Sequence, residues 1–353
     1  MTRAAILVEQ NWNAVPGGTA RATNRLIDSL AKYTEVSVVG VHGRHGKAPQ
    51  LPLPAGLETV AVPLPGRALA ETWSRTRFPS MDRWVDSEVV HAPAYVLPPT
   101  ASPLVVTIHD LAFVQHPEWF TPNGVSYLLR FLKRVHESDA AVIVPSSATA
   151  DDCVAQGIAS ERVHEIPWGI DVQVASDAEI DRVRRLYELP ETFVLFVGTI
   201  EPRKNLQTLA DAITALPGIP LVVVGPAGWG EINVAGATLL GEVPGADIEP
   251  IMAAATVLAY PSHFEGFGLP VLEAMAQGTP VVTTAGTAPA EIAAGGGVAV
   301  DTRSASLLAT ALGDLIADGE QRRELGEIGQ ARAFEFSWSE TARRTADVYE
   351  AVR

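Results

Sequence analysis

The sequence has one cysteine, Cys153, among 353 residues, so no disulfide can form within the chain. This excludes the small disulfide-stabilised folds and suits a reducing compartment. No uninterrupted apolar run reaches the ~20 residues that a bilayer-spanning helix needs. The N-terminal residues have no small-residue cleavage site, so they indicate a buried strand rather than a signal peptide. We therefore expect a cytoplasmic protein.

A surplus of basic charge is also missing. The net charge is −15, and residues 1–170 hold 14 Lys and Arg against 16 Asp and Glu, whereas residues 171–353 hold 12 against 25. A general nucleic-acid-binding protein needs a basic face, so this class is excluded. A simple contribution to solubility is enough to explain the acidic second half. No repeat of 20–50 residues is visible, which excludes a solenoid.

Short apolar runs alternate with segments of helical period along most of the chain. Continuous apolar strands between helices are typical of parallel sheets that are covered on both faces, so the pattern predicts a doubly wound α/β fold. The strand-like runs are residues 4–9, 36–41, 105–110, 140–146, 193–198, 220–225, 256–262 and 280–284.

The length favours two domains, because single cores stop growing at about 250–300 residues. The segment 163–177 carries Pro, Gly and Asp between two series of alternating strands and helices, so it is the expected linker. We place the domains at residues 1–168 and 171–337. Residues 338–353 form an amphipathic pattern after a serine that can cap a helix.

The stretch HFEGFGLPVLEA (263–274) joins a strand to a helix that starts near Pro270. Such loops lie at the carboxyl edge of a sheet, where ligands bind, and Gly266 and Gly268 let a ligand approach the backbone. Glu265 and Glu273 would accept hydrogen bonds from hydroxyl groups on either side of a diphosphate. On this pattern alone, a solvated Glu265 and a Glu273 that complements the helix dipole explain the spacing equally well.

Other polar residues also follow predicted strands. Arg203 and Lys204 come after the run that ends at Gly198, where two cations would neutralise a diphosphate. His109 ends the strand 105–110, and a structural histidine is the alternative there. His42 and His45 are expected in a solvated loop.

The stretch HFEGFGLPVLEAMAQGTPVV resembles the glutamate-x7-glutamate signature of the retaining glycosyl transferases group 1 family. VPGGTAR (15–21), VVTIHDLAFVQHPEWF, VGTIEPRKN and FSWSETA are similar to further motifs of that family, in the same order. The resemblance implies a GT-B fold, in which two Rossmann-like domains face each other across a cleft. It further implies an acceptor-side domain at 1–168, a donor-binding domain at 171–337, a hinge near residues 168–171 and a last helix that packs back on the first domain.

The resemblance also implies the roles of individual residues. Glu265 would face the donor sugar and Glu273 the ribose, and Lys204, with Arg203, would bind the phosphates. Thr199 stands where many members have an arginine, which is why Arg203 is taken as the second cation. His109 would help to position the reacting groups. The remaining expected donor contacts are Gly17, Gly18, Gly241, Val243, Gly266, Phe267, Gly268 and Leu269.

No Asp-x-Asp motif, the metal anchor of the other large glycosyltransferase fold, occurs in the sequence, and no His/Cys cluster has zinc spacing. We therefore expect no metal and no cofactor besides the nucleotide diphosphate sugar. The family is thought to react on a single face of the sugar, with retention of configuration. An inverting reaction with His109 as general base, assisted by Asp110, is the rival mechanism.

The expected reaction moves a hexose, with GDP-mannose as the favoured donor, to a glycan, lipid-linked or small-molecule acceptor. A nucleotide-sugar epimerase of the same fold and a non-catalytic binding subunit are the alternatives. Basic and aromatic residues interleave in 66–84 and 127–137. They suit an acidic or lipid-linked acceptor, or peripheral contact with the inner membrane surface, and a solvated face explains them equally well.

Overall fold

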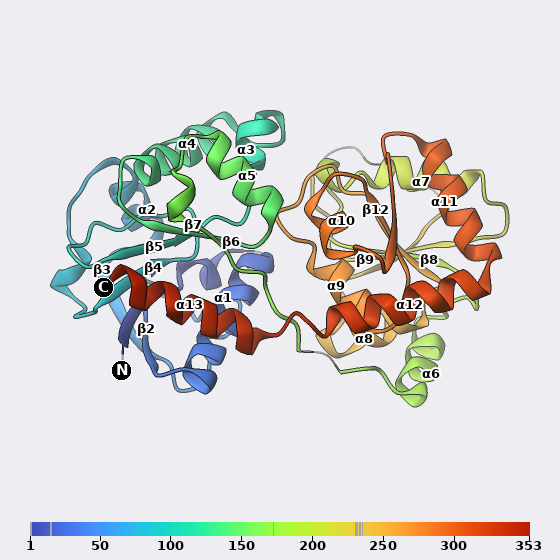
Figure 1. The fold of residues 1–353 in the computed structure, drawn as a ribbon, viewed down its shortest axis with the longest axis horizontal. Coiled ribbons are helices and arrows are strands. Elements are labelled where there is room, and N and C mark those ends of the chain that lie inside the picture. Colours follow the sequence, from blue (N-terminus) through green and yellow to red (C-terminus); the bar gives the residue numbers. More distant parts are fainter. Residues whose placement is uncertain (1, 15, 172, 230–231, 233, 235) are drawn as a thin grey trace. The chain divides into compact units, whose positions relative to one another are not determined.

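The computed structural model describes residues 2–14, 16–171, 173–229, 232, 234 and 236–353. Val15 of the Gly-Gly motif and Val172 of the expected linker lie outside the described residues. The chain divides into two compact units, coloured along the sequence in Figure 1: unit 1 is Met1–Gly169 with Ser337–Arg353, and unit 2 is Ile170–Phe336. No helix in the described part of the chain is both long and apolar enough to cross a membrane.

Unit 1 is built on a parallel sheet with the strand order β3-β2-β1-β4-β5-β6-β7. Its strands are β1 (Thr2–Leu7), β2 (Val36–Arg44), β3 (Glu58–Pro65), β4 (Val89–Ala92), β5 (Leu104–Thr107), β6 (Ala141–Val144) and β7 (Val163–Glu165). The strand order changes direction between β1 and β4. Ligands of open parallel sheets bind beyond the carboxyl ends of the strands at such a switch point.

Helices cover both faces of this sheet. They are α1 (Gly17–Tyr33), α2 (Gly66–Arg75), α3 (Ala112–Gln115), α4 (Pro122–His136), α5 (Ser147–Ala155) and α13 (Trp338–Val352), with 3-10 turns η1 (Glu9–Trp12), η2 (Met81–Arg83), η3 (Pro117–Trp119) and η4 (Ser160–Arg162). Alternate residues of β1 point to opposite faces, so Ile6 packs with α1 and α13 while Leu7 packs with α2 and α4. Burial on both faces explains why the strands are continuously apolar.

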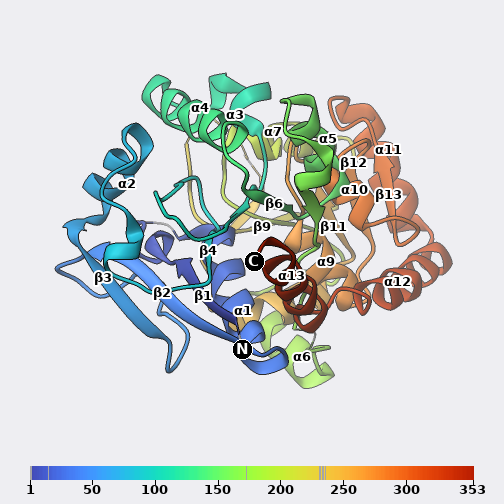
Figure 2. The ribbon, with the colours of Figure 1, turned by 60° about the vertical axis from the view of Figure 1, so that its left-hand side comes forward.

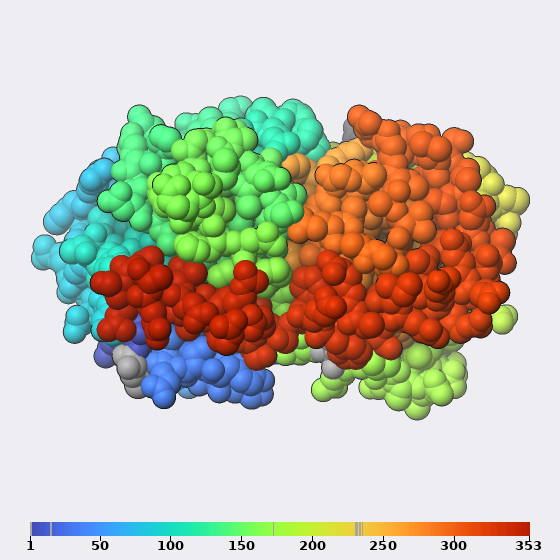
Figure 3. All heavy atoms as spheres, viewed as in Figure 1, coloured from blue at the N-terminus to red at the C-terminus, as the bar shows by residue number. Residues whose placement is uncertain are grey.

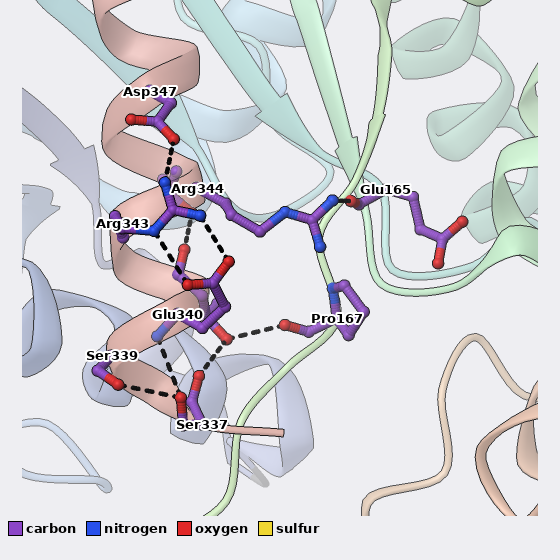
Figure 4. A network of polar contacts seen from close by, with 10 residues as sticks. Glu165, Pro167, Ser337, Ser339, Glu340, Arg343, Arg344 and Asp347 are labelled. Carbon is purple, nitrogen blue, oxygen red and sulfur yellow. Dashed lines mark hydrogen bonds and ion pairs between the residues drawn. The ribbon is translucent and has the colours of Figure 1, made fainter. Parts of the chain in front are cut away.

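The last helix of the chain belongs to unit 1. Ser337 caps α13, and Thr341 Oγ1 donates to the Pro167 carbonyl over 2.8 Å. Arg344 donates to the Glu165 carbonyl, as Figure 4 shows. α13 packs beside α1, which is visible in Figures 1 and 2, and its outer surface is red in Figure 3. The chain therefore returns to its first unit to complete one face of that unit's sheet.

Unit 2 has a parallel sheet with the strand order β10-β9-β8-β11-β12-β13. Its strands are β8 (Val194–Val197), β9 (Leu221–Val224), β10 (Thr238–Gly241), β11 (Val257–Tyr260), β12 (Val281–Thr284) and β13 (Gly297–Val300). Its helices are α6 (Asp177–Leu186), α7 (Leu206–Thr214), α8 (Gly245–Ala254), α9 (Leu269–Ala276), α10 (Ala288–Ile292), α11 (Ala305–Ala317) and α12 (Gly319–Ala333), with the 3-10 turn η5 (Pro202–Lys204). Here the switch point lies between β8 and β11.

The predicted fold class, two α/β domains with parallel sheets, is confirmed. All eight predicted strand runs overlap observed strands. Five strands, β3, β4, β7, β10 and β13, were not predicted from the pattern. β3 and β10 are edge strands with several exposed residues, and β7 has three half-buried ones, so they lack the continuous apolar run of a central strand.

Candidate functional site

The loops after β8 and β11 meet at the switch point of unit 2. β8 and β11 are neighbouring parallel strands, so their carboxyl ends lie at the same edge of the sheet. The first loop carries Arg203 and Lys204 in η5, and the second carries Glu265. His263 N–H donates to the Arg203 carbonyl over 2.9 Å, which joins the two loops through the backbone.

Glu265 pairs with both predicted phosphate-binding cations. Its Oε1 lies 2.5 Å from Lys204 Nζ, and its Oε2 lies 2.7 Å from Arg203 Nη1. Arg203 Nη1 also donates to the Phe264 carbonyl over 3.0 Å. Each carboxylate oxygen therefore holds one cation, and Glu265 is not the solvated loop residue of the alternative interpretation.

Two further residues complete this cluster, and the sequence interpretation missed both. Glu201 Oε1 lies 2.8 Å from Arg203 Nη2 and accepts from Arg203 Nε over 3.0 Å. Tyr260, the last residue of β11, accepts from Lys204 Nζ over 2.8 Å. Glu201 could have been identified from its position two residues before Arg203 in the same motif. Tyr260 could have been identified from its position at the end of a predicted strand.

The cluster is almost closed to solvent. Glu201 is 4% exposed, Lys204 8% and Tyr260 2%. Burial opposes ionisation of Glu265, but the charges of Lys204 and Arg203 outweigh it and lower the pKa of Glu265 to about 2. Burial, with a contribution from Glu265, raises the pKa of Tyr260 to about 12. The site therefore holds two cations, two carboxylates and a neutral phenol at neutral pH, and its net charge is zero.

This pKa shift predicts a specific acid sensitivity. Because the pKa of Glu265 is lower in the folded protein than in the unfolded chain, its stabilising contribution is complete above about pH 5 and is lost as the pH falls towards 2. The contribution corresponds to about 3 kcal/mol of the free energy of unfolding. Denaturant unfolding measures the free energy of unfolding at pH 7 and pH 3. This free energy should fall more between the two pH values for the wild type than for Glu265→Gln. Equal decreases in the two proteins would contradict the lowered pKa of Glu265.

The loop from Gly266 to Leu269 leads directly into α9. Gly268 precedes the helix at φ +116°, a conformation that favours glycine. Phe267 is buried and packs its ring against Phe336, with 6.2 Å between the ring centroids, so only its backbone is suited to a ligand contact. Glu273 is half-buried in α9, eight residues after Glu265 along the chain.

Gly241 is the last residue of β10, the edge strand of the same sheet, and Val243 follows that strand. β10 pairs with β9, which pairs with β8, and Gly225 N–H donates to the Gly241 carbonyl over 2.8 Å. Gly241 has φ +68°, and both predicted base contacts are half-buried. The loop between β10 and α8 therefore lies at the carboxyl edge of the sheet, on the side of the switch point that contains β9.

His109 belongs to unit 1, just beyond β5. Its Nε2 lies 2.7 Å from the Pro93 carbonyl and its ring lies edge-on to Trp168, with 5.1 Å between centroids. Burial lowers the pKa of His109, so the ring is neutral, Nε2 carries the proton and Nδ1 has the free lone pair. Nδ1 is itself buried without a hydrogen-bond partner among the described residues. The imidazole is thus held inside unit 1, a geometry that suits positioning better than proton abstraction.

A buried polar chain connects the strand of His109 to the last helix. His91 of β4 lies 2.6 Å from Tyr349 Oη of α13 and 2.8 Å from Thr107 Oγ1 of β5. Burial lowers the pKa of His91 to about 3, so it remains neutral. A cavity of about 20 Å³ has room for one water molecule, and its lining includes His91, Thr107, His109 and Trp338. α13 therefore supports the segment that carries His109.

The Gly-Gly motif starts α1. Gly17 is the first residue of the helix with φ +66°, and Gly18 is exposed. A Cβ atom at either position would meet nothing within 4 Å, so the space above this helix start is open. The motif follows β1, one of the two strands at the switch point of unit 1.

The expectation of a solvated loop for His42 and His45 is wrong. His42 lies in β2, and both rings stack on Trp12 at centroid distances of 4.5 and 4.4 Å. His45 Nε2 also lies 3.0 Å from Glu9 Oε1. The pattern gave no sign of this packing because Trp12 and Glu9 come from the preceding β1–α1 connection.

The structure thus gathers Arg203, Lys204 and Glu265 in unit 2, with the Gly266–Leu269 loop and Glu273 following in the chain. Gly17, Gly18 and His109 belong to unit 1. Within the described ranges, no group of three or more His, Cys, Asp or Glu side chains is arranged to hold a metal ion. The arrangement in unit 2 supplies cations, carboxylates and a glycine-rich helix start, which together suit a phosphorylated and hydroxylated ligand.

Two family models match consecutive parts of the chain. The model described as Glycosyl transferases group 1 matches residues 177–332, and the model described as Glycosyltransferase Family 4 matches residues 16–174. The chain belongs to the group 1 glycosyltransferases of GT-B fold, and its enzyme class is glycosyltransferase.

Among curated proteins, the chain is 28% identical over 281 residues to O-antigen chain mannosyltransferase B of Escherichia coli, covering 74% of each. It is 31% identical over 264 residues to D-inositol 3-phosphate glycosyltransferase of Segniliparus rotundus, covering 68% of this chain and 59% of the relative, which is less than two thirds of that relative's length.

Solved structures show the same fold. Sucrose-phosphate synthase from Thermosynechococcus elongatus matches with a TM-score of 0.80 at 21% identity, covering 99% of each chain. Anabaena HepE in complex with UDP and glucose matches with a TM-score of 0.75 at 19% identity, covering 99% of this chain and all of the other.

Proposed function

We propose that this glycosyltransferase moves a hexose from a nucleotide diphosphate sugar, with GDP-mannose as the favoured donor, to a glycan, lipid-linked or small-molecule acceptor. The transfer proceeds with retention of the anomeric configuration and without a metal ion. The observation that carries the proposal is the pair of cations, Arg203 and Lys204, held against Glu265 at the switch point of the unit 2 sheet.

Each part of the donor has a candidate partner in unit 2. Lys204 and Arg203 are placed for the diphosphate, Glu265 for the sugar hydroxyls and Glu273 for the ribose hydroxyls. Gly241 and Val243 border the place proposed for the base. Mannose as the transferred sugar is supported by the likeness to the Escherichia coli mannosyltransferase, and the UDP-bound HepE structure makes UDP the first competitor of GDP.

Retention is supported by the environment of His109. An inverting reaction needs a general base that reaches the acceptor hydroxyl. His109 Nε2 is occupied by the Pro93 carbonyl and Nδ1 is buried, so the reaction proposed here uses a leaving phosphate oxygen to take the acceptor proton instead. Anomeric analysis of the product distinguishes the two mechanisms, and an inverted linkage would overturn this proposal.

Calorimetric titration with GDP, UDP, dTDP and their hexose conjugates in EDTA tests the donor site. One nucleotide should bind selectively to the wild type. Glu273→Ala should weaken that nucleotide by about 10- to 100-fold, because a charged acceptor of ribose hydroxyls is lost. Exposed Glu324 of α12 offers a matched control, since Glu324→Ala removes the same charge from the same unit. Absence of binding by every nucleotide would overturn the donor assignment.

A lipid-linked acceptor would bring the enzyme to the inner membrane surface, and unit 1 has a suitable face. Around α2 and α4, Phe78 is 64% exposed and Leu129 46%, and Arg77, Arg83 and Lys133 are exposed beside them. Basic and apolar side chains together favour anionic lipid surfaces. Co-sedimentation with phosphatidylglycerol vesicles should therefore exceed that with phosphatidylcholine vesicles, and equal sedimentation would remove the membrane contact.

A further inference from the structure

The phosphate-binding cations of unit 2 are already neutralised by the protein. Arg203 contacts Glu201 and Glu265, and Lys204 contacts Glu265. Two positive charges therefore face two negative charges in a nearly buried cluster. A diphosphate that joined this cluster unchanged would make it strongly negative, and Glu265 would lie beside the phosphate oxygens at a distance where like charges repel.

The two carboxylates are held differently. Glu201 lies two residues before Arg203 on the same short segment, and its side chain is 5% exposed. Its contact to Arg203 is therefore local and does not depend on another loop. Glu265 lies on the loop after β11, is followed by Gly266, and reaches Lys204 across two loops. Glu265 is the carboxylate whose contact can be exchanged by a rearrangement of one loop.

Tyr260 holds the second cation in place. Its hydroxyl accepts from Lys204 Nζ over 2.8 Å, and its ring centroid lies 5.0 Å from the same nitrogen. Lys204 thus keeps a neutral partner on the rigid end of β11 when a charged partner leaves. A phosphate oxygen can take the place of the carboxylate oxygen because both are anionic acceptors of the same kind of hydrogen bond.

We infer that the donor diphosphate displaces the Glu265 carboxylate from Lys204 and Arg203, while Glu201 and Tyr260 act as positioning residues that keep the two cations in place. Glu265 thereby becomes free for the sugar hydroxyls only when a donor is bound. In the absence of a donor it occupies the phosphate position as an internal anion. This inference rests on the proposed donor site.

The exchange predicts that replacing Glu265 raises the affinity for the nucleotide, whereas replacing an ordinary contact residue lowers it. Glu265→Gln removes the competing anion, so the nucleoside diphosphate selected in the titration should bind about tenfold more tightly than to the wild type. Transfer should fall at the same time by about 100-fold or more, because the charged contact to the sugar is lost. A residue that merely contacted the donor would lose affinity when replaced. Glu324→Gln, which removes an exposed charge, should change neither property.

A second substitution protects the test against a folding defect. Glu265→Asp keeps the charge but is one methylene shorter, so it cannot hold both cations at the present distances, and it should also bind the nucleotide more tightly than the wild type does. If neither Glu265→Gln nor Glu265→Asp binds the nucleotide more tightly than the wild type does, the proposed displacement of Glu265 is overturned. The donor site itself would still stand. If no nucleotide binds the wild type or either variant, the donor site itself fails.

Discussion

Lys204→Ala is expected to remove transfer almost completely and to destabilise unit 2. Lys204 is 8% exposed, contacts Glu265 and Tyr260, and is the cation proposed for the donor phosphates. Removal of one electrostatic donor of this kind lowers kcat by about 100- to 1,000-fold. Loss of one partner of a buried ion pair lowers the free energy of unfolding by about 3–5 kcal/mol. Steady-state kinetics and denaturant unfolding measure the two effects separately.

The double variant Lys204→Ala, Glu265→Ala separates stability from function. It removes the carboxylate together with its principal cation, so much of the lost stability should return, because no uncompensated buried charge remains. Transfer should stay as low as in the single variant. Recovery of transfer together with stability would mean that Lys204 is structural and that the phosphates are bound elsewhere.

Gly268→Ala is expected to produce the second large loss of activity. Gly268 has φ +116°, and a Cβ atom there would lie 3.0 Å from Cγ of Pro289 on α10. Alanine is strained at this φ, and the contact with Pro289 is a few tenths of an ångström too close, so we expect the loop that joins Glu265 to Glu273 to be displaced. A displacement of about 1 Å in a positioned site can lower the rate by about 100-fold. Nucleotide affinity and transfer, measured together, should both fall.

Gly278 provides the control at the other end of the same helix. It has φ +74°, and a Cβ atom there would meet only a side-chain nitrogen of Gln330 at 4.0 Å. Gly278→Ala should cost about 1–2 kcal/mol of backbone strain and leave nucleotide affinity unchanged. If the two alanine variants lose activity equally, strain in α9 rather than displacement of the donor loop accounts for the effect.

The sequence predicted the architecture because its signals are local. Alternation of apolar strands and helical segments requires no knowledge of partners, and it gave the parallel α/β class and the runs that became the central strands. Strands without that signal, such as β3 and β10 at the sheet edges, were missed because their residues are partly exposed. Resemblance to a family then assigned roles to residues such as Glu265 and Lys204, which no periodicity indicates.

Tertiary structure decided which of these residues meet and what charge they carry. Glu265 lies about sixty residues from Lys204 in the chain, and only the pairing of β8 with β11 brings their loops to one sheet edge. The same pairing places Tyr260 beneath Lys204, while burial turns Glu201 from an ordinary loop acid into a permanent partner of Arg203. The sequence by itself therefore predicted two adjacent cations at a strand end, and their diphosphate role stays a prediction. That the pair is already neutralised, and by which carboxylates, depends on distances and burial that arise only when the strands assemble.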